Sequence, residues 1–140
     1  MKQQALQLAI QQVKTKTHDT RLYLQICEKL DMAPDTAWVS TTDTKCRIQQ
    51  EKLENELNSY KTNQIKESIR MGHNDLADFF YQRGLLEQAL RIYIKSRDYC
   101  ATSKHIIQTS LNVIRVAIEM KEFGVVESYV NRAEQTPDVN

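Results

Sequence analysis

Apolar residues recur at three- and four-residue steps along most of the chain, which is the period of an amphipathic helix. The first two segments of this kind lie within residues 1–31, and Asp19 after a polar break can cap the second helix. Residues 43–71 are strongly helix-favouring, with a potential break near Thr62 and Asn63. The pattern predicts a helical hairpin followed by one long or broken helix.

Two further segments look like connections between helices. Residues 32–42 contain a proline and several hydroxyl side chains that favour turns, and we expect Trp38 to anchor this loop on the core. Gly72 can adopt the left-handed conformation that ends many helices. We therefore expect a helix boundary at Gly72, followed by a new helix capped by Asn74 or Asp75.

Residues 75–99 carry the most specific pattern in the chain, because small and large residues follow the spacing of a tetratricopeptide (TPR) hairpin. In such a hairpin, small residues let two antiparallel helices approach closely while large residues fill the gaps between them. The residues expected to pack this repeat are Ala77, Phe80, Gly84, Ala89 and Tyr93. A weaker copy follows at residues 105–135, and apolar residues cover every side of its first helix, as in a helix packed between neighbours.

These segments predict an all-α fold in which antiparallel helical hairpins stack as a short TPR-like right-handed solenoid. We expect roughly 70 to 80% of the residues to be helical, with no sheet. The composition agrees, because 3 Gly and 2 Pro among 140 residues are too few for the many tight turns of a β-sandwich or barrel. The length fits a single domain over residues 1–140.

The charge balance argues against two classes of partner. The chain has 19 Lys and Arg against 18 Asp and Glu, and a formal net charge of +1 provides no field that would attract nucleic acid or an anionic membrane. No run approaches the roughly 18 apolar residues of a membrane span. Cys27, Cys46 and Cys100 have no paired spacing, which favours reduced thiols in a soluble cytosolic or nuclear protein.

Nothing in the sequence predicts chemistry. His18, His73 and His105 are far apart and belong to no metal-binding helix motif, so we expect each to be a surface side chain. Cys100 lies near Lys104 and His105, which can lower a thiol pKa, but the Gly-rich approach and oxyanion donors of a nucleophilic site are missing. We predict no catalytic residue, no metal ligand, no cofactor and no enzymatic activity.

Three short motifs stand out in the second half of the chain: IKESIR at residues 65–70, the Gly-x-x-Asp-Leu step at Gly72–Leu76, and the Arg-Asp-Tyr-Cys step that ends at Cys100. With the later stretches SKHIIQTSLNVIRVAIEM and SYVNRAE, they resemble the family of first subunits of the COP-nine signalosome, which removes a ubiquitin-like modifier from cullins. The resemblance covers residues 60–135 firmly and residues 5–30 more loosely. A related proteasome-lid subunit shares the architecture, but the Arg-Asp-Tyr-Cys step favours the signalosome member.

The resemblance implies a non-catalytic scaffold of the PCI family that supports cullin deneddylation and the regulation of ubiquitin ligases, in the nucleus and the cytoplasm. Family members continue into further repeats and a C-terminal PCI domain, which these 140 residues lack, so we expect an N-terminal fragment. The implied partners are the other signalosome subunits, bound mainly through the missing C-terminal region, together with cullin-ligase components or signalling proteins. Two alternatives stay open: a free-standing TPR-type adaptor that binds short peptides, and the equivalent proteasome-lid subunit.

Several polar residues of the matching region are not required for a helical core. We expect them either to clamp helices together or to contact a partner; these candidates are Lys66, Arg70, Asp75, Arg97, Asp98, Tyr99 and Lys104. We prefer the clamp, in which Arg70 and Arg97 pair with carboxylates such as Asp75 and Asp98. A basic strip that includes Lys95 is interpreted as a solvated face, with a docking surface for an acidic partner as the alternative.

Overall fold

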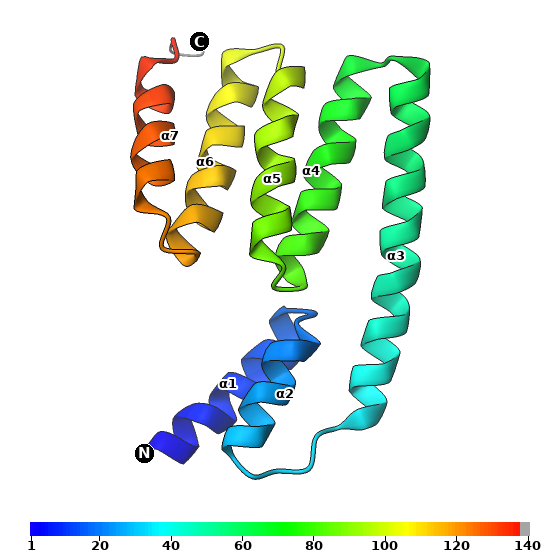
Figure 1. The fold of residues 1–140 in the computed structure, drawn as a ribbon, viewed down its shortest axis with the longest axis vertical. Helices are drawn as coiled ribbons and strands as arrows, with labels where there is room; N and C mark the ends of the chain where they lie inside the picture. The colour runs from blue at the N-terminus through cyan, green and yellow to red at the C-terminus, as the bar shows by residue number, and fades with distance from the viewer. Residues whose placement is uncertain (138–140) are drawn as a thin grey trace. The chain divides into compact units, whose positions relative to one another are not determined.

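The computed structural model describes residues 1–137, of which 83% are helical and none belongs to a strand. This confirms the all-α prediction, with slightly more helix than expected. The elements in chain order are α1 (Lys2–Lys16), α2 (Thr20–Lys29), α3 (Thr36–Asn63), α4 (Lys66–Gln82), α5 (Leu86–Ser96), the 3₁₀ turn η1 (Arg97–Tyr99), α6 (Ser103–Glu119) and α7 (Phe123–Gln135) (Figure 1). None of these helices combines the length and the hydropathy needed to cross a membrane.

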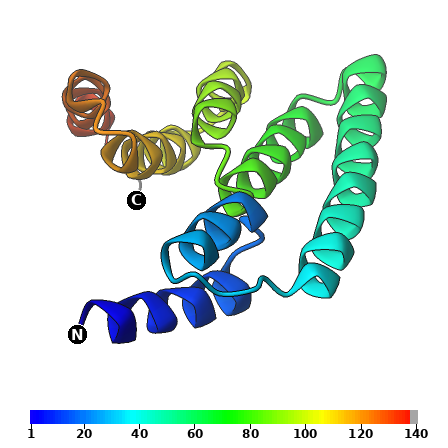
Figure 2. The same cartoon turned by 60° about the horizontal axis from the view of Figure 1, so that its bottom comes forward.

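The helices belong to two compact units. Unit 1 contains residues 1–51 together with the short turn Gln82–Gly84, and unit 2 contains Lys52–Tyr81 and the chain from Leu85 onward. In unit 2, helices α4 to α7 follow one another as antiparallel neighbours (Figures 1 and 2). The expectation of a single helical-repeat domain over residues 1–140 stays a prediction.

The core of unit 1 lies between α1, α2 and the first turns of α3. Its buried residues are Val13, Tyr23, Ile26 and Cys27, and Trp38 packs against them with its ring centroid 4.8 Å from that of Tyr23. Trp38 is in α3 and not in a loop as predicted, because the Asp35 carboxylate accepts a hydrogen bond from the Trp38 backbone N–H (3.1 Å) and caps the helix early. The predicted anchoring on the core is present.

Four helices end in the same left-handed turn. A residue one or two positions after each of these helix ends has a positive φ, and the next backbone N–H bonds to the carbonyl five residues earlier, as from Leu85 to Phe80 at 2.9 Å. The four left-handed residues are Asp31, Gln64, Gly84 and Lys121. The turn at Gln64 separates α3 from α4, so the broken helix is the alternative that the structure shows.

The predicted helix boundary at Gly72 is wrong, since Gly72 lies buried in the middle of α4. A Cβ at this position would lie 3.0 Å from Leu57 Cδ1 and 3.2 Å from the Tyr60 ring. The absence of a side chain therefore lets α4 approach α3 closely. Asn74 and Asp75, which we expected to cap a new helix, are also inside α4.

The TPR-like contacts of unit 2 centre on fully buried small residues. Ala77 and Ala89 have no exposed surface, and Tyr93 in the same helix as Ala89 is also completely buried. In the second copy Ala117 is fully buried, but Leu111 of the same helix is 57% exposed. The expectation that α6 is covered on every side is therefore wrong. Its neighbours α5 and α7 bury only part of its apolar surface.

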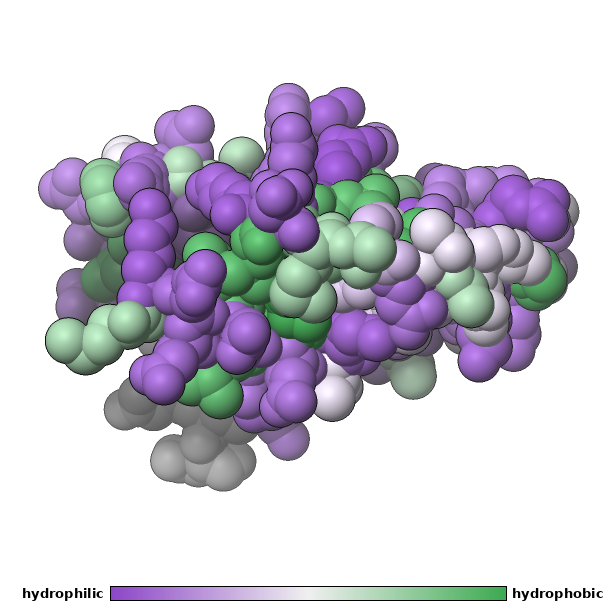
Figure 3. Space-filling model, turned by 90° about the horizontal axis from the view of Figure 1, so that it is seen from below, coloured by the Kyte–Doolittle hydropathy of each residue, from purple (hydrophilic) through white to green (hydrophobic). Residues whose placement is uncertain are grey.

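The surface alternates between charged and apolar groups. Figure 3 shows one face on which hydrophilic side chains surround smaller areas of apolar ones. Such a mixture is normal for folded domains, because polar side chains are too few to cover the whole surface.

Within unit 1 the turn Gln82–Gly84 contacts the start of α2. The His18 backbone N–H donates to the Gln82 carbonyl (2.9 Å), and Arg83 Nη1 donates to the His18 carbonyl (2.7 Å) and to Asp43 Oδ1 (3.1 Å). Asp19 caps α2 by accepting a hydrogen bond from the Leu22 N–H (3.0 Å). Gly84 has a φ of 76°, and a Cβ there would lie 2.0 Å from the Asp19 carboxylate.

We therefore predict that Gly84→Ala lowers the free energy of unfolding by about 2 kcal/mol, since it combines left-handed strain with displacement of the Asp19 cap. Gly124→Ala is the matched control, because a Cβ on Gly124 meets nothing within 4 Å. Alanine favours a helix over glycine, so the control should raise stability by at most about 1 kcal/mol. Chemical denaturation of both variants measures the difference, and equal effects would contradict the turn contact.

Candidate functional site

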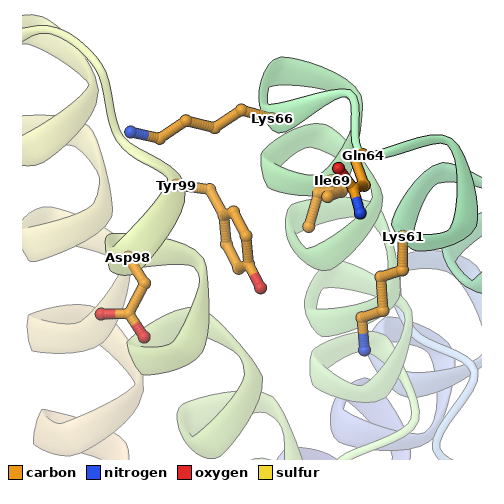
Figure 4. A pocket seen from close by; sticks show the side chains of 6 residues that line it. All are labelled: Lys61, Gln64, Lys66, Ile69, Asp98 and Tyr99. Atoms are coloured by element: carbon orange, nitrogen blue, oxygen red, sulfur yellow. The ribbon is translucent and has the colours of Figure 1, made fainter.

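A pocket of about 510 Å³ opens in unit 2 between the α3–α4 turn and η1 (Figure 4). Its lining residues are Lys61, Gln64, Lys66, Ile69, Asp98 and Tyr99. Three of them, Lys66, Asp98 and Tyr99, are sequence-predicted candidates. The other three were missed, because only the left-handed turn at Gln64 brings the end of α3 to the start of α4.

Short local bonds position the residues on the η1 side. The buried hydroxyl of Ser96 donates to the Tyr93 carbonyl (2.6 Å) at the end of α5, and the Cys100 N–H donates to the Arg97 carbonyl (3.1 Å) to close η1. The chain is then extended at Cys100, before α6 begins. In Figure 4 the Tyr99 ring points from η1 toward α4, with the Lys66 and Lys61 side chains on opposite sides of it.

His73 supports the Tyr99 ring from inside the helix stack. The two rings are nearly parallel at 18°, with centroids 5.4 Å apart, and His73 is only 3% exposed. Its Nδ1 lies 2.9 Å from the Ile69 carbonyl, which can only accept, so Nδ1 carries the proton and donates. The prediction of a surface histidine is wrong here, because the residue lies on the buried face of α4.

Burial lowers the pKa of His73, and the positive charges of Lys61 and Lys95 lower it further. The hydrogen bond to the Ile69 carbonyl and, to a lesser extent, the charge of Asp98 raise the pKa, but burial is the largest effect and the net shift is downward. His73 is therefore a neutral imidazole at neutral pH.

Arg70 does not form the predicted pair with Asp75. It pairs instead with Glu67 on its own helix, from Nε at 3.0 Å and from Nη2 at 2.5 Å, and its side chain is 12% exposed. The guanidinium lowers the pKa of the Glu67 carboxyl. His105 Nδ1 lies 4.0 Å from the same carboxylate and is buried without a hydrogen-bond partner, so His105 is only partly a surface residue.

The remaining candidates lie elsewhere. Arg97 and Lys104 are exposed, and neither forms an ion pair with a described residue, so the predicted pair of Arg97 with Asp98 is also not formed. Asp75 lies near Asp78 and Glu56, and burial together with these negative charges raises its pKa. The candidate residues are thus not brought together at one site, and their role in binding stays a prediction.

A polar network that the sequence analysis missed joins α4, α5 and α6. The Tyr93 hydroxyl donates to the Asp78 carboxylate and accepts from Arg115 Nη2 (3.3 Å). The Arg115 guanidinium lies over the Tyr81 ring, 4.4 Å from its centroid, and the Tyr81 hydroxyl donates to Glu119. A single arginine within the apolar sequence of α6 was the available signal. The network stabilises the helix stack by satisfying a buried hydroxyl.

The potential metal ligands and the free thiols among residues 1–137 do not gather at one place. No three His, Cys, Asp or Glu side chains of this region lie close enough together to hold a metal ion. Cys27 and Cys46 are buried free thiols, and burial raises the pKa of Cys46. The Cys100 sulfur contacts the Thr109 hydroxyl at 3.4 Å.

The fold defines the class of protein: it is an all-helical protein built from successive antiparallel helices. A family model described as 26S proteasome subunit RPN7 matches residues 35–140, more than half of the chain, and the chain belongs to this family.

Curated relatives agree with the resemblance to signalosome first subunits. COP9 signalosome complex subunit 1 of Arabidopsis thaliana is 46% identical over 140 residues, which cover 96% of this chain and 32% of the relative. COP9 signalosome complex subunit 1b of Drosophila melanogaster is 48% identical over 111 residues, which cover 79% of this chain and 21% of the relative. COP9 signalosome complex subunit 1 of Schizosaccharomyces pombe is 35% identical over 133 residues, which cover 91% of this chain and 32% of the relative. The chain thus spans a third or less of the length of these relatives.

The buried, neutral state of His73 predicts a pH dependence of stability. Its folded-state pKa is lowered below the unfolded value of about 6.5, so the unfolded chain takes up a proton first as the pH falls. The free energy of unfolding should therefore decrease from about pH 7.5 to pH 5.5, where ordinary carboxyl groups contribute little. His73→Gln should flatten this decrease, as denaturation at several pH values would show.

His18→Gln is the control for replacing a histidine by glutamine, because the His18 side chain is exposed and that of His73 is buried. Equal pH dependences of the wild-type chain and His73→Gln would mean that His73 does not set it.

Proposed function

We propose that this chain is the N-terminal helical-repeat part of a signalosome subunit and acts as a non-catalytic scaffold in cullin deneddylation and the regulation of ubiquitin ligases. The observation that carries the proposal is the 46% identity to the Arabidopsis thaliana relative across 96% of the chain. The stacked hairpins of unit 2 support it, because repeats of this kind offer extended surfaces to other proteins.

The proposed partners are other signalosome subunits, bound mainly through a C-terminal PCI region of the kind that the family carries. Cullin-ligase components or signalling proteins are further proposed partners of the repeat surface. The nucleus and the cytoplasm are the proposed locations, because ubiquitin-ligase regulation takes place in both.

The surroundings of the reactive side chains support a non-catalytic role. His73 is packed against Tyr99, and the thiol of Cys100 contacts Thr109 next to the buried end of α5. A general base or nucleophile must reach its substrate in an open site. The three histidines also lie in separate parts of the sequence, on or near different helices.

The equivalent proteasome-lid subunit is the second candidate, because the matching family model carries that description. The two candidates predict different complexes. A chimaera in which this chain replaces the matching region of the Arabidopsis thaliana relative can separate them, since the alignment covers nearly the whole chain.

We predict that the tagged chimaera, purified from plant cells and analysed by mass spectrometry, recovers the other signalosome subunits in the amounts that the unaltered relative recovers. The chain alone should recover much less, because the proposed assembly region lies outside it. Recovery of proteasome-lid subunits by the chimaera would support the second candidate, and recovery of neither set would contradict both.

A second prediction concerns activity. The purified chain should not release the ubiquitin-like modifier from a modified cullin, with or without added zinc, because no open metal site is assembled in residues 1–137. The complete signalosome, acting on the same substrate, is the positive control. Zinc-dependent cleavage that coelutes with the chain in gel filtration would show that the non-catalytic assignment is wrong.

A further inference from the structure

We infer that the pocket between the α3–α4 turn and η1 is a docking site for a short acidic peptide segment that carries an apolar side chain among its carboxylates. The inference deepens the proposed function, since it rests on the chain being a protein-interaction module.

The pocket contains two cationic side chains that have no carboxylate partner. Lys61 and Lys66 are exposed, and neither forms an ion pair with a described residue. Exposed cationic side chains without an ion pair also occur elsewhere among the described residues, as at Arg97 and Lys104, but Lys61 and Lys66 line a pocket. The ammonium groups of the pocket are therefore available to an incoming acid, which they attract at the cost of little desolvation.

The pocket lining carries two positive side chains, Lys61 and Lys66, against one negative side chain, Asp98. Lys95 is close enough to act on His73 from α5, as Lys61 does from α3, and both lower the pKa of that buried residue. The pocket lies at the N-terminal end of α4, where the helix dipole favours negative charge. Asp98 is the one acidic residue of the lining.

An apolar floor distinguishes this pocket from an ordinary lysine-rich surface. Ile69 is 6% exposed and lies on the buried face of α4, while the Tyr99 ring stacks on the buried His73. This stacking holds the ring in place before any ligand arrives, so binding would cost little side-chain entropy. An aliphatic or aromatic side chain of the ligand can pack against Ile69 and Tyr99 while neighbouring carboxylates reach the lysines.

The same lining favours a peptide over a phosphate-rich ligand. No arginine lines the pocket, so the bidentate fork that recognises phosphate is missing. The carboxylate of Asp98 would repel a compact polyanion, but it can accept a backbone N–H from an extended peptide. An acidic segment with an apolar residue matches each of these features.

The test measures binding of fluorescein-labelled peptides to the 140-residue chain by fluorescence anisotropy. The probe is Glu-Asp-Leu-Asp-Glu. The first comparison peptide, Gln-Asn-Leu-Asn-Gln, removes the charge, and the second, Glu-Asp-Gly-Asp-Glu, removes the apolar side chain. Tripolyphosphate is added as a competitor, and amide chemical shifts of Gln64 and Tyr99 report where the probe binds.

The critical variant is the double substitution Lys61→Gln, Lys66→Gln. Its matched control is Lys45→Gln, Lys52→Gln, which removes the same charge from two exposed lysines of α3 outside the pocket lining. All four lysines are exposed, so neither variant should alter folding, and circular dichroism checks this.

We expect the pocket variant to weaken binding of the acidic probe about tenfold, as the loss of two exposed charge contacts would. The control variant should retain the affinity, both comparison peptides should bind more weakly, and about 0.5 M salt should reduce binding. Equal loss in both lysine variants would show diffuse attraction and overturn the inference. Tight competition by tripolyphosphate would instead identify a general anion site, and the absence of probe binding would also overturn the inference.

These outcomes are independent of complex assembly, because the isolated chain is used. Failure of the peptide assay with normal subunit recovery by the chimaera would remove the docking site and leave the proposed scaffold function in place.

Discussion

Close approach of successive helices is the constraint on which unit 2 depends. It requires positions without a bulky side chain where the helices meet, and Gly72, Ala77, Ala89 and Ala117 occupy such buried positions. A Cβ at Gly72 would already press on Leu57. Because the backbones approach closely, every polar group between them must find a partner within the stack. That requirement explains the buried bonds of Tyr93, Ser96 and His73.

The candidate site follows from this packing. His73 is buried because α4 packs closely against its neighbours, and its imidazole then forms a flat surface on which Tyr99 stacks. The 3₁₀ turn after α5 brings Tyr99 to this place, while the left-handed turn at Gln64 brings two lysines to the other side of the pocket. The pocket thus lies between the end of α3 on one side and the end of α5 on the other. Its lining residues come from segments about thirty positions apart in the chain.

A family of scaffold subunits is a reasonable setting for such a surface. The family match and the relatives define what the chain is similar to, and the relatives are at least three times as long as the part that they share with it. Interaction sites on helical repeats are built from exposed side chains on a rigid frame, whereas catalysis needs reactive groups that converge in an open site. In this chain His73 is packed against Tyr99, and the Cys100 sulfur contacts the Thr109 hydroxyl.

The sequence by itself determined the helical class and the TPR-like spacing with Gly84 near the turn of its hairpin, because periodicity and glycine conformation act over a few residues. Tertiary structure decided the rest. The local sequence predicts a helix end at Gly72, but this residue is a contact between helices. His73 was predicted at the surface and is buried. Arg70 pairs with Glu67 and not with Asp75. The pocket could not be predicted, because it depends on how helix ends from different parts of the chain come together. No local sequence pattern determines how close these helix ends lie in space.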